Sequence, residues 1–151
     1  MDTLGGAEEL QSLTIGYVFG DAIDVESNRL LLELEANLVL AAPRTLRWVV
    51  YELVGSYYEA RYDKVVSNQS GSGYISSGPL SYTLKAGRKY LLGVAVSDGG
   101  FVPYYDAVPW QPEVSFGKAL GSLAIGYSTS LYYGYVATDR VYDLRITTEL
   151  P

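Results

Sequence analysis

The side chains of this sequence that could do chemistry are aromatic and acidic, and they are densest between Phe101 and Pro112. Four of them lie within seven positions: Tyr104, Tyr105, Asp106 and Trp110. Three prolines in the same stretch would stiffen a loop and reduce the entropy that it loses on binding a ligand. An aromatic ring can pack on the apolar face of a sugar, and a carboxylate can accept hydrogen bonds from its hydroxyls. The stretch therefore predicts a structured loop that binds a glycan, with structural packing of the same rings as the alternative.

The chain contains 15 tyrosines, and two further groups of them could extend this aromatic surface. The groups are Tyr57, Tyr58 and Tyr62, and Tyr132, Tyr133 and Tyr135. Adjacent tyrosines on a strand point to opposite faces, so one ring of each pair would face outward unless the strand is covered twice. Because tyrosine is enriched at protein interfaces, a second hypothesis is that the partner is another copy of the chain, in a homo-oligomer or a surface fibre.

Three acidic residues could form a metal site. Asp21, Asp24 and Glu26 follow one another closely after a Gly-Asp turn signal, and we expect them to lie in one loop. Calcium takes about six to eight oxygen ligands, often from the carboxylates and carbonyls of a loop. Calcium is therefore the one cofactor that the sequence suggests, and ordinary turn-capping aspartates, with no cofactor, are the alternative.

Enzymatic chemistry has few tools in this chain. It contains no histidine and no cysteine, which excludes disulfides, Cys and His nucleophiles, and zinc sites built from those ligands. Ser115 and Lys118 have the spacing of a serine acyl-transferase motif, but Gly117 interrupts the turn and the partner motif is missing. Glu33 and Glu35 share a strand face, as paired glycosidase carboxylates could, but we interpret them as a charged outer face. We expect no enzymatic activity.

Charge and composition narrow the partners and the location. The chain carries 11 Lys and Arg against 17 Asp and Glu, a net charge of −6. Nucleic-acid binders ordinarily present a basic surface, so we expect no nucleic-acid partner. No apolar run approaches the roughly 18 residues of a membrane span, so we expect no membrane insertion. The abundance of Tyr, Gly, Ser and Thr favours an extracellular or cell-surface module, whose leader would be absent from this chain because residues 1–10 do not resemble one.

The elements that must position these residues have the pattern of β-strands almost throughout. Leucines alternate with other residues over 30–40, which predicts a strand, although the Leu, Glu and Ala content also suits a helix. We expect Pro43 to end that segment and the polar, Gly-rich residues 67–73 to form a loop. Trp48, in the next alternating segment, is expected in the core. Residues 90–96 are almost wholly apolar, which predicts a central strand covered on both faces.

The closing strands are expected at 122–128, 131–137 and 141–148, the last with Tyr142, Leu144 and Ile146 on one face. The whole pattern is about nine or ten short strands with regularly spaced turns and no amphipathic helix. It predicts an all-β fold: a two-sheet antiparallel β-sandwich of jelly-roll-like topology, in a single domain over residues 1–151.

One internal similarity stands out. Residues 12–17 (SLTIGY) and 122–127 (SLAIGY) differ at a single position. One short match does not make a repeat array. We interpret it as two strands in similar environments, with equivalent positions in the two sheets, or exchange of one strand for the other between subunits, as the alternatives.

Residues 81–96 (SYTLKAGRKYLLGVAV) resemble a hairpin of secreted bacterial β-sandwich modules, including those attached to the C-terminal side of exported peptidases. In that hairpin a strand ends in an Ala-Gly turn, here Ala86-Gly87, and a tyrosine-containing strand returns, here from Tyr90. The resemblance implies a noncatalytic accessory module of jelly-roll or related topology, sometimes with calcium or glycan contacts. It covers a short part of the chain and carries no functional residue over to it.

Overall fold

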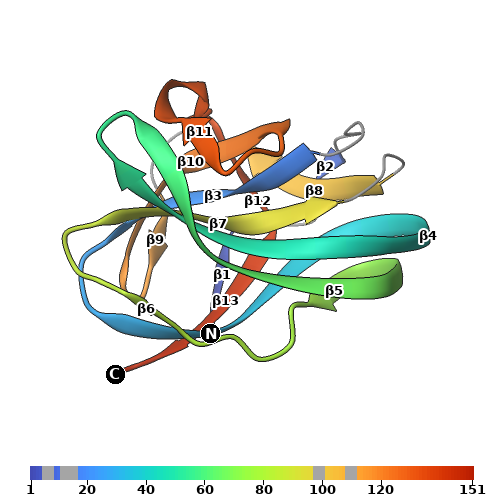
Figure 1. The fold of residues 1–151 in the computed structure, drawn as a ribbon, viewed down its shortest axis with the longest axis horizontal. Coiled ribbons are helices and arrows are strands. Elements are labelled where there is room, and N and C mark those ends of the chain that lie inside the picture. Colours follow the sequence, from blue (N-terminus) through green and yellow to red (C-terminus); the bar gives the residue numbers. More distant parts are fainter. Residues whose placement is uncertain (5–8, 11–16, 97–100, 108–111) are drawn as a thin grey trace.

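The computed structural model describes residues 1–4, 9–10, 17–96, 101–107 and 112–151, and it is built almost entirely from antiparallel strands (Figure 1). The strands are β1 (Asp2–Leu4), β2 (Glu9–Leu10), β3 (Tyr17–Val25), β4 (Arg29–Val54), β5 (Tyr57–Ser76), β6 (Tyr82–Leu84), β7 (Lys89–Val96), β8 (Phe101–Ala107), β9 (Glu113–Val114), β10 (Gly117–Gly126), β11 (Ser130–Tyr132), β12 (Arg140–Tyr142) and β13 (Leu144–Glu149). One 3₁₀ turn, η1 (Tyr133–Tyr135), follows β11. The predicted all-β class is confirmed. Within these ranges we find no helix long and apolar enough to span a membrane.

The strands form one continuous sheet rather than two separate ones. Its main path runs β1-β13-β4-β7-β3-β10-β9 and curls until its two ends meet, so that the sheet is nearly closed like a barrel (Figure 1). Strand pairing therefore does not show the two separate sheets that the sequence predicted. At the seam β1 and β9 lie in contact, and the Asp2 carboxylate bridges them. It accepts hydrogen bonds from the backbone N–H of Ser115 at 2.7 Å and from its hydroxyl at 2.8 Å.

Replacing Asp2 by alanine is expected to lower the free energy of unfolding by about 1 kcal/mol, because two hydrogen bonds to a carboxylate disappear from a partly exposed seam. Urea unfolding of the two proteins measures this difference. Glu26→Ala is the control, since Glu26 is exposed and its carboxylate makes no hydrogen bond or ion pair within the described ranges. Equal losses in both variants would mean that Asp2 does not hold the seam.

The longest feature of the sheet is the ribbon formed by β4 and β5. Residues 46–54 of β4 pair with residues 57–66 of β5, and residues 35–40 pair with 71–76, so the two strands stay together over most of their length. Between these halves the ribbon bends back at one end of the molecule (Figure 1). The first half of β4 pairs with β13 and the second half with β7, so this one strand carries the sheet around the turn.

Two sequence predictions at this bend are wrong. Pro43 does not end the strand: it lies exposed where the pairing register shifts between Leu40 and Arg44, at a bulge that tolerates a residue without an N–H. Residues 67–73 are not a loop, since Gly71 and Gly73 still pair with β4. Both glycines have positive φ, of 102° and 105°, which lets β5 follow the bend.

Alternation of side chains along the strands builds two hydrophobic clusters on opposite faces of the sheet. The main cluster holds Trp48, Leu92, Tyr142, Leu144 and Ile146, among others. The core position of Trp48 is thus confirmed, and Tyr142, Leu144 and Ile146 share one face as predicted. The second cluster holds Tyr51, Tyr58, Leu91 and Leu131. Neighbours Leu91 and Leu92 of β7 thus bury opposite faces, which confirms that β7 is a central strand covered twice.

A pair of glycines allows β3 and β7 to approach each other closely. Gly20 and Gly93 are register partners across the two strands. A Cβ on Gly93 would lie 2.1 Å from the carbonyl oxygen of Phe19, and one on Gly20 would lie 2.3 Å from that of Leu92. Because both obstacles are backbone atoms of the central sheet, a side chain at either position requires the strands to move apart.

The structure describes part of the internal similarity between residues 12–17 and 122–127, and all of the hairpin-like segment 81–96. Tyr17, the last residue of the first segment, is the register partner of Gly126 in the neighbouring strand β10. Residues 12–16 lie outside the described ranges. The hairpin suggested by residues 81–96 is wrong: β6 pairs with residues 29–31 of β4, whereas β7 pairs with residues 46–52 and with β3.

Candidate functional site

Four exposed tyrosines gather at the end of the molecule where η1 and β11 lie. We call them the tyrosine patch: Tyr57, Tyr132, Tyr133 and Tyr135. Their exposed fractions are 48%, 42%, 47% and 62%, which is high for aromatic side chains that lie together. In Figure 1 both chain termini lie at the opposite side of the molecule from β11, so the patch is clear of them.

Tyr132 is the centre of the patch. Its ring centroid lies 5.7 Å from that of Tyr57, 5.3 Å from that of Tyr133 and 5.4 Å from that of Tyr135. The interplanar angles are 57°, 61° and 81°, so Tyr57 is tilted against Tyr132 and the other two rings meet it edge to face, as aromatic pairs prefer. The patch is therefore a faceted aromatic surface rather than a flat one.

Backbone pairing and two buried neighbours fix this arrangement. In the β5–β11 pair Tyr57 is the register partner of Tyr132, and Tyr58 is that of Leu131. Tyr58 and Leu131 are almost fully buried in the second cluster, so strand alternation turns the next residue of each strand outward. The N–H of Tyr133 also donates to the carbonyl of Ser56, at 3.1 Å, which ties η1 to the turn before β5.

Gly134 makes room for the central ring. A Cβ at this position would lie 2.3 Å from Cε2 of Tyr132 and 2.9 Å from its Cζ. Since the obstacle is the tyrosine ring and not the backbone, a side chain at residue 134 would displace the ring and leave the sheet intact. The glycine is thus a requirement of the patch rather than of the fold.

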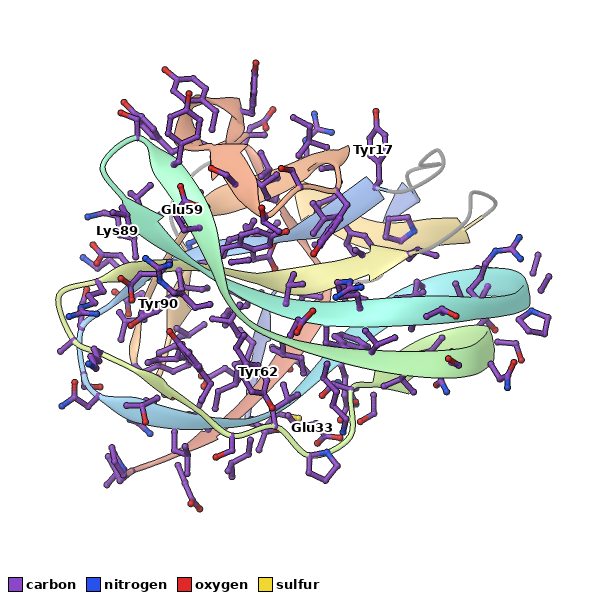
Figure 2. All side chains as sticks on the ribbon, viewed as in Figure 1. Tyr17, Glu33, Glu59, Tyr62, Lys89 and Tyr90 are labelled. Carbon is purple, nitrogen blue, oxygen red and sulfur yellow. The ribbon has the colours of Figure 1, made fainter. Side chains whose placement is uncertain are left out.

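A mostly apolar hollow of about 440 Å³ borders the patch. Leu53, Leu120 and Val136 form its walls, Tyr133 belongs to both the hollow and the patch, and Lys89 supplies a cation at its edge. Tyr58 also lines it, and burial, with a smaller contribution from the charge of Asp24, raises the pKa of this phenol to about 12. Tyr58 is therefore a neutral hydroxyl here. Figure 2 labels Lys89 and also Glu59, whose carboxylate accepts a 2.9 Å hydrogen bond from the hydroxyl of Ser130.

The residues predicted to bind a glycan lie mostly on a strand. Tyr104, Tyr105 and Asp106 belong to β8, where Tyr105 pairs with Tyr142 and with Glu9. The prediction of a loop is therefore wrong for residues 101–107. The local prolines suggested a loop, whereas the strand is formed by pairing with residues far away in the sequence. Trp110 lies outside the described ranges, as do the side chains of the other three residues, so this binding site stays a prediction.

The three acidic residues proposed for calcium are not brought together. Asp21 and Asp24 lie within β3 rather than in a loop. Asp21 shares its face with Phe19 and Ile23 of the main cluster, whereas Asp24 acts on Tyr58 on the other face; Glu26 is exposed beyond the strand. In the described part of the chain, no group of three acidic side chains is placed to hold a metal. Calcium binding stays a prediction, and these three residues do not form one site for it.

Asp21 is instead a fully buried carboxyl group. Its Oδ1 accepts a hydrogen bond of 2.7 Å from the backbone N–H of Tyr142, and its Oδ2 has no hydrogen-bond partner in the described structure. Burial raises the pKa of Asp21 well above its usual value; the Tyr142 N–H opposes this shift, and the charge of Asp143 adds to it. None of the ion pairs between described residues includes Asp21.

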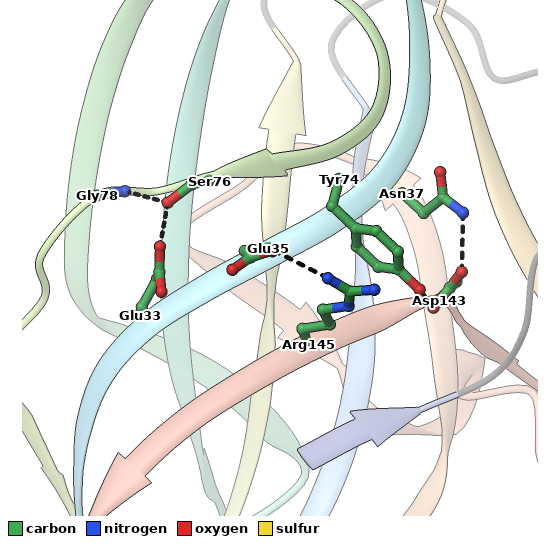
Figure 3. A network of polar contacts seen from close by, with 8 residues as sticks. All are labelled: Glu33, Glu35, Asn37, Tyr74, Ser76, Gly78, Asp143 and Arg145. Atoms are coloured by element: carbon green, nitrogen blue, oxygen red, sulfur yellow. Dashed lines mark hydrogen bonds and ion pairs between the residues drawn. The ribbon is translucent and has the colours of Figure 1, made fainter. Parts of the chain in front are cut away.

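Asp143 and the glutamates of β4 also belong to a polar network (Figure 3). Buried Asp143 accepts hydrogen bonds from Asn37 at 2.9 Å and from the hydroxyl of Tyr74 at 2.6 Å. The guanidinium of Arg145 lies 3.5 Å from the centre of the Tyr74 ring and 3.8 Å from Glu35.

Glu33 accepts a hydrogen bond from Ser76. Each glutamate of this strand face thus has its own strand partner, as a structural role on the outer face requires, and the geometry gives no reason to assign them to catalysis.

The sequence drew attention to the tyrosines of the patch but not to their convergence. The local signals that could have indicated it are the Gly55-Ser56 turn, which is exposed before Tyr57, and Gly134 between two tyrosines. Their meaning depends on the β5–β11 register, which joins segments far apart in the chain. No family model matches this sequence, and no curated protein is similar enough to it to count as a match.

Proposed function

We propose that this chain is a noncatalytic binding module that takes carbohydrate on the tyrosine patch and the adjoining hollow. The observation that carries the proposal is the group of four tyrosines whose rings remain about half exposed although three of them contact the ring of Tyr132. A binding surface that is ordered in advance loses little entropy when it takes a ligand. The tyrosines offer apolar ring faces for sugar C–H groups and phenol hydroxyls for sugar hydroxyls.

The arrangement of the rings favours one class of glycan. Rings inclined at 57° to 81° cannot stack together on one flat polysaccharide surface. Each ring can stack on a separate sugar residue of a bent or branched chain. We infer that the ligand is such a soluble or surface-displayed glycan, with one sugar seated in the hollow beside Tyr133. The predicted contact at Trp110 and an extracellular, jelly-roll-like two-sheet module belong to the same proposal.

Titration of a glycan array, followed by calorimetry with the best ligand, tests this function. Tyr132→Ala is expected to weaken binding tenfold or more, because truncating a central aromatic residue of a binding surface often costs about 2 kcal/mol. Gly134→Ala is expected to weaken binding as well, since it displaces the same ring without removing it. Circular dichroism and thermal unfolding establish that both variants remain folded.

Tyr127→Ala is the matched control. Tyr127 is also an exposed tyrosine, but its ring lies under the guanidinium of Arg47, 5.4 Å away, and makes no described contact with the patch. This variant should bind as the original protein does. Unchanged affinity in Tyr132→Ala, or an array on which no glycan binds, would refute the proposal.

Self-assembly is the second candidate function, and the same exposed aromatic surface favours it, because tyrosines are enriched where proteins meet. Light scattering distinguishes the two. A large species that becomes monomeric in Tyr132→Ala would support assembly through the patch, whereas a monomer at high concentration would exclude it.

A further inference from the structure

The contacts within the tyrosine patch have a consequence for covalent chemistry. Tyr132 touches three other tyrosine rings at centroid distances of 5.3 to 5.7 Å, and all four side chains are open to solvent. Elsewhere in the described structure, Tyr82 contacts the rings of Tyr62 and Tyr90, but Tyr90 is fully buried and Tyr62 and Tyr82 are less exposed than the patch tyrosines. The patch is therefore where neighbouring tyrosines combine close contact with access for an external oxidant.

We propose that the patch is a site of oxidative tyrosine cross-linking, in which Tyr57 and Tyr132 couple within one chain. A peroxidase using hydrogen peroxide takes one electron and one proton from each phenol. The two tyrosyl radicals then join through ring carbons next to the hydroxyls, and the hydrogens on those carbons move to the phenol oxygens. One carbon–carbon bond forms, the pair loses two hydrogen atoms in all, and one hydrogen peroxide becomes two water molecules.

Among the ring contacts of the patch, this pair is the one that joins two strands. Tyr57 and Tyr132 are partners across β5 and β11, so the backbone holds their rings together even though they are far apart in the sequence. Coupling of Tyr132 to Tyr133 or Tyr135 would close only a short loop within β11 and η1. A Tyr57–Tyr132 bond would instead fasten β11, a strand of three residues, to the β4–β5 ribbon. Since a cross-link reduces the entropy of the unfolded chain, the product should unfold at a higher temperature.

This inference rests on ring contact and exposure and does not depend on carbohydrate binding. The two can be separated with one variant, because Tyr132→Phe keeps an aromatic ring for stacking and lacks the phenol hydrogen that must leave. Retained glycan binding with lost cross-linking supports both proposals. If the original protein binds no glycan but Tyr132→Phe abolishes its cross-linking, only the proposed function is overturned.

The test treats the dilute full chain with peroxidase and hydrogen peroxide. We expect an intact mass lower by two hydrogen atoms, the blue fluorescence of a dityrosine, and a linked pair of proteolytic peptides containing Tyr57 and Tyr132. Tyr57→Phe should remove that linked pair, and Tyr132→Phe should remove every cross-link within the patch. Tyr127→Phe is the control, since it removes an exposed tyrosine outside the patch, and it should leave the yield unchanged.

Three results would overturn the proposal. One is an unchanged yield of cross-link in Tyr132→Phe, and another is linked peptides that map to Tyr127 or to the Tyr62–Tyr82 pair instead. The third is coupling only between chains, seen as covalent dimers at protein concentrations where the untreated protein is monomeric. Any of these would show that ring contact in the patch does not direct the chemistry.

Discussion

Replacing Gly93 by alanine is expected to destabilise the protein by about 3 kcal/mol or to prevent folding, because overpacking of this kind strains the backbone as well as side chains. The added methyl group would meet the carbonyl oxygen of Phe19 at 2.1 Å, in the middle of the β3–β7 pair. The clash cannot be relieved by a rotamer change, and both faces of β7 are packed against hydrophobic clusters. Urea unfolding monitored by the fluorescence of buried Trp48 would measure the change.

Two further glycine variants make this result specific. Gly20→Ala should be similarly costly, because Gly20 is the register partner of Gly93 and its Cβ would lie 2.3 Å from the oxygen of Leu92. Gly126→Ala is the matched control, since Gly126 is also a strand glycine but has open space around its Cβ position. If all three variants lost the same stability, close approach of β3 and β7 would not be the cause.

The second large effect is a dependence of stability on pH that comes from Asp21. Burial raises the pKa of Asp21 in the folded protein, so between the unfolded value of about 3.9 and the folded value the native state binds more protons than the unfolded state. The free energy of unfolding should therefore fall as the pH rises from about 4 through the folded pKa of this group. In Asp21→Asn this contribution is absent, so the variant should gain stability relative to the original protein as the pH rises.

Denaturant unfolding from pH 4 to pH 9 would measure the difference between the two proteins at each pH. Asp24→Asn, on the same strand and the opposite face, is the control for the Asp-to-Asn substitution itself. Asp21→Ala should be destabilising by about 1–3 kcal/mol at low pH, because it removes the acceptor of the buried Tyr142 N–H. A constant difference between Asp21→Asn and the original protein across the range would contradict the assignment.

The sequence was sufficient for features that depend on local alternation. The all-β class, the central strand 90–96 and the core position of Trp48 follow from periods of two and from apolar runs, and the structure confirms them. Pro43 and residues 67–73 misled because proline and glycine usually interrupt strands. Here β4 and β5 remain paired on both sides of a bend, and this pairing tolerates a bulge at the bend. The local sequence of either strand does not predict that bulge.

The candidate site was predictable in its residue types and not in its location. The sequence indicates Tyr57, Tyr132, Tyr133 and Tyr135 as parts of an aromatic surface, but only the β5–β11 register brings Tyr57 to the others. For Asp21 and Asp24, the location in a strand rather than a loop removes the shared metal site that the sequence suggested. Asp21 and Asp24 are three positions apart, which suits a metal-binding loop, but in a strand that spacing sends them to opposite faces.

The bend of the β4–β5 ribbon also bears on how the molecule loses its structure. The strand that pairs with β13 is the same uninterrupted strand that pairs with β7, so no flexible connection separates the two regions. Opening one region would pull on the backbone of the other through residues 41–45. We therefore expect the amides on both halves of β4 to exchange with solvent through one shared, global opening. The continuous strand thus couples the unfolding of the two regions that it pairs with.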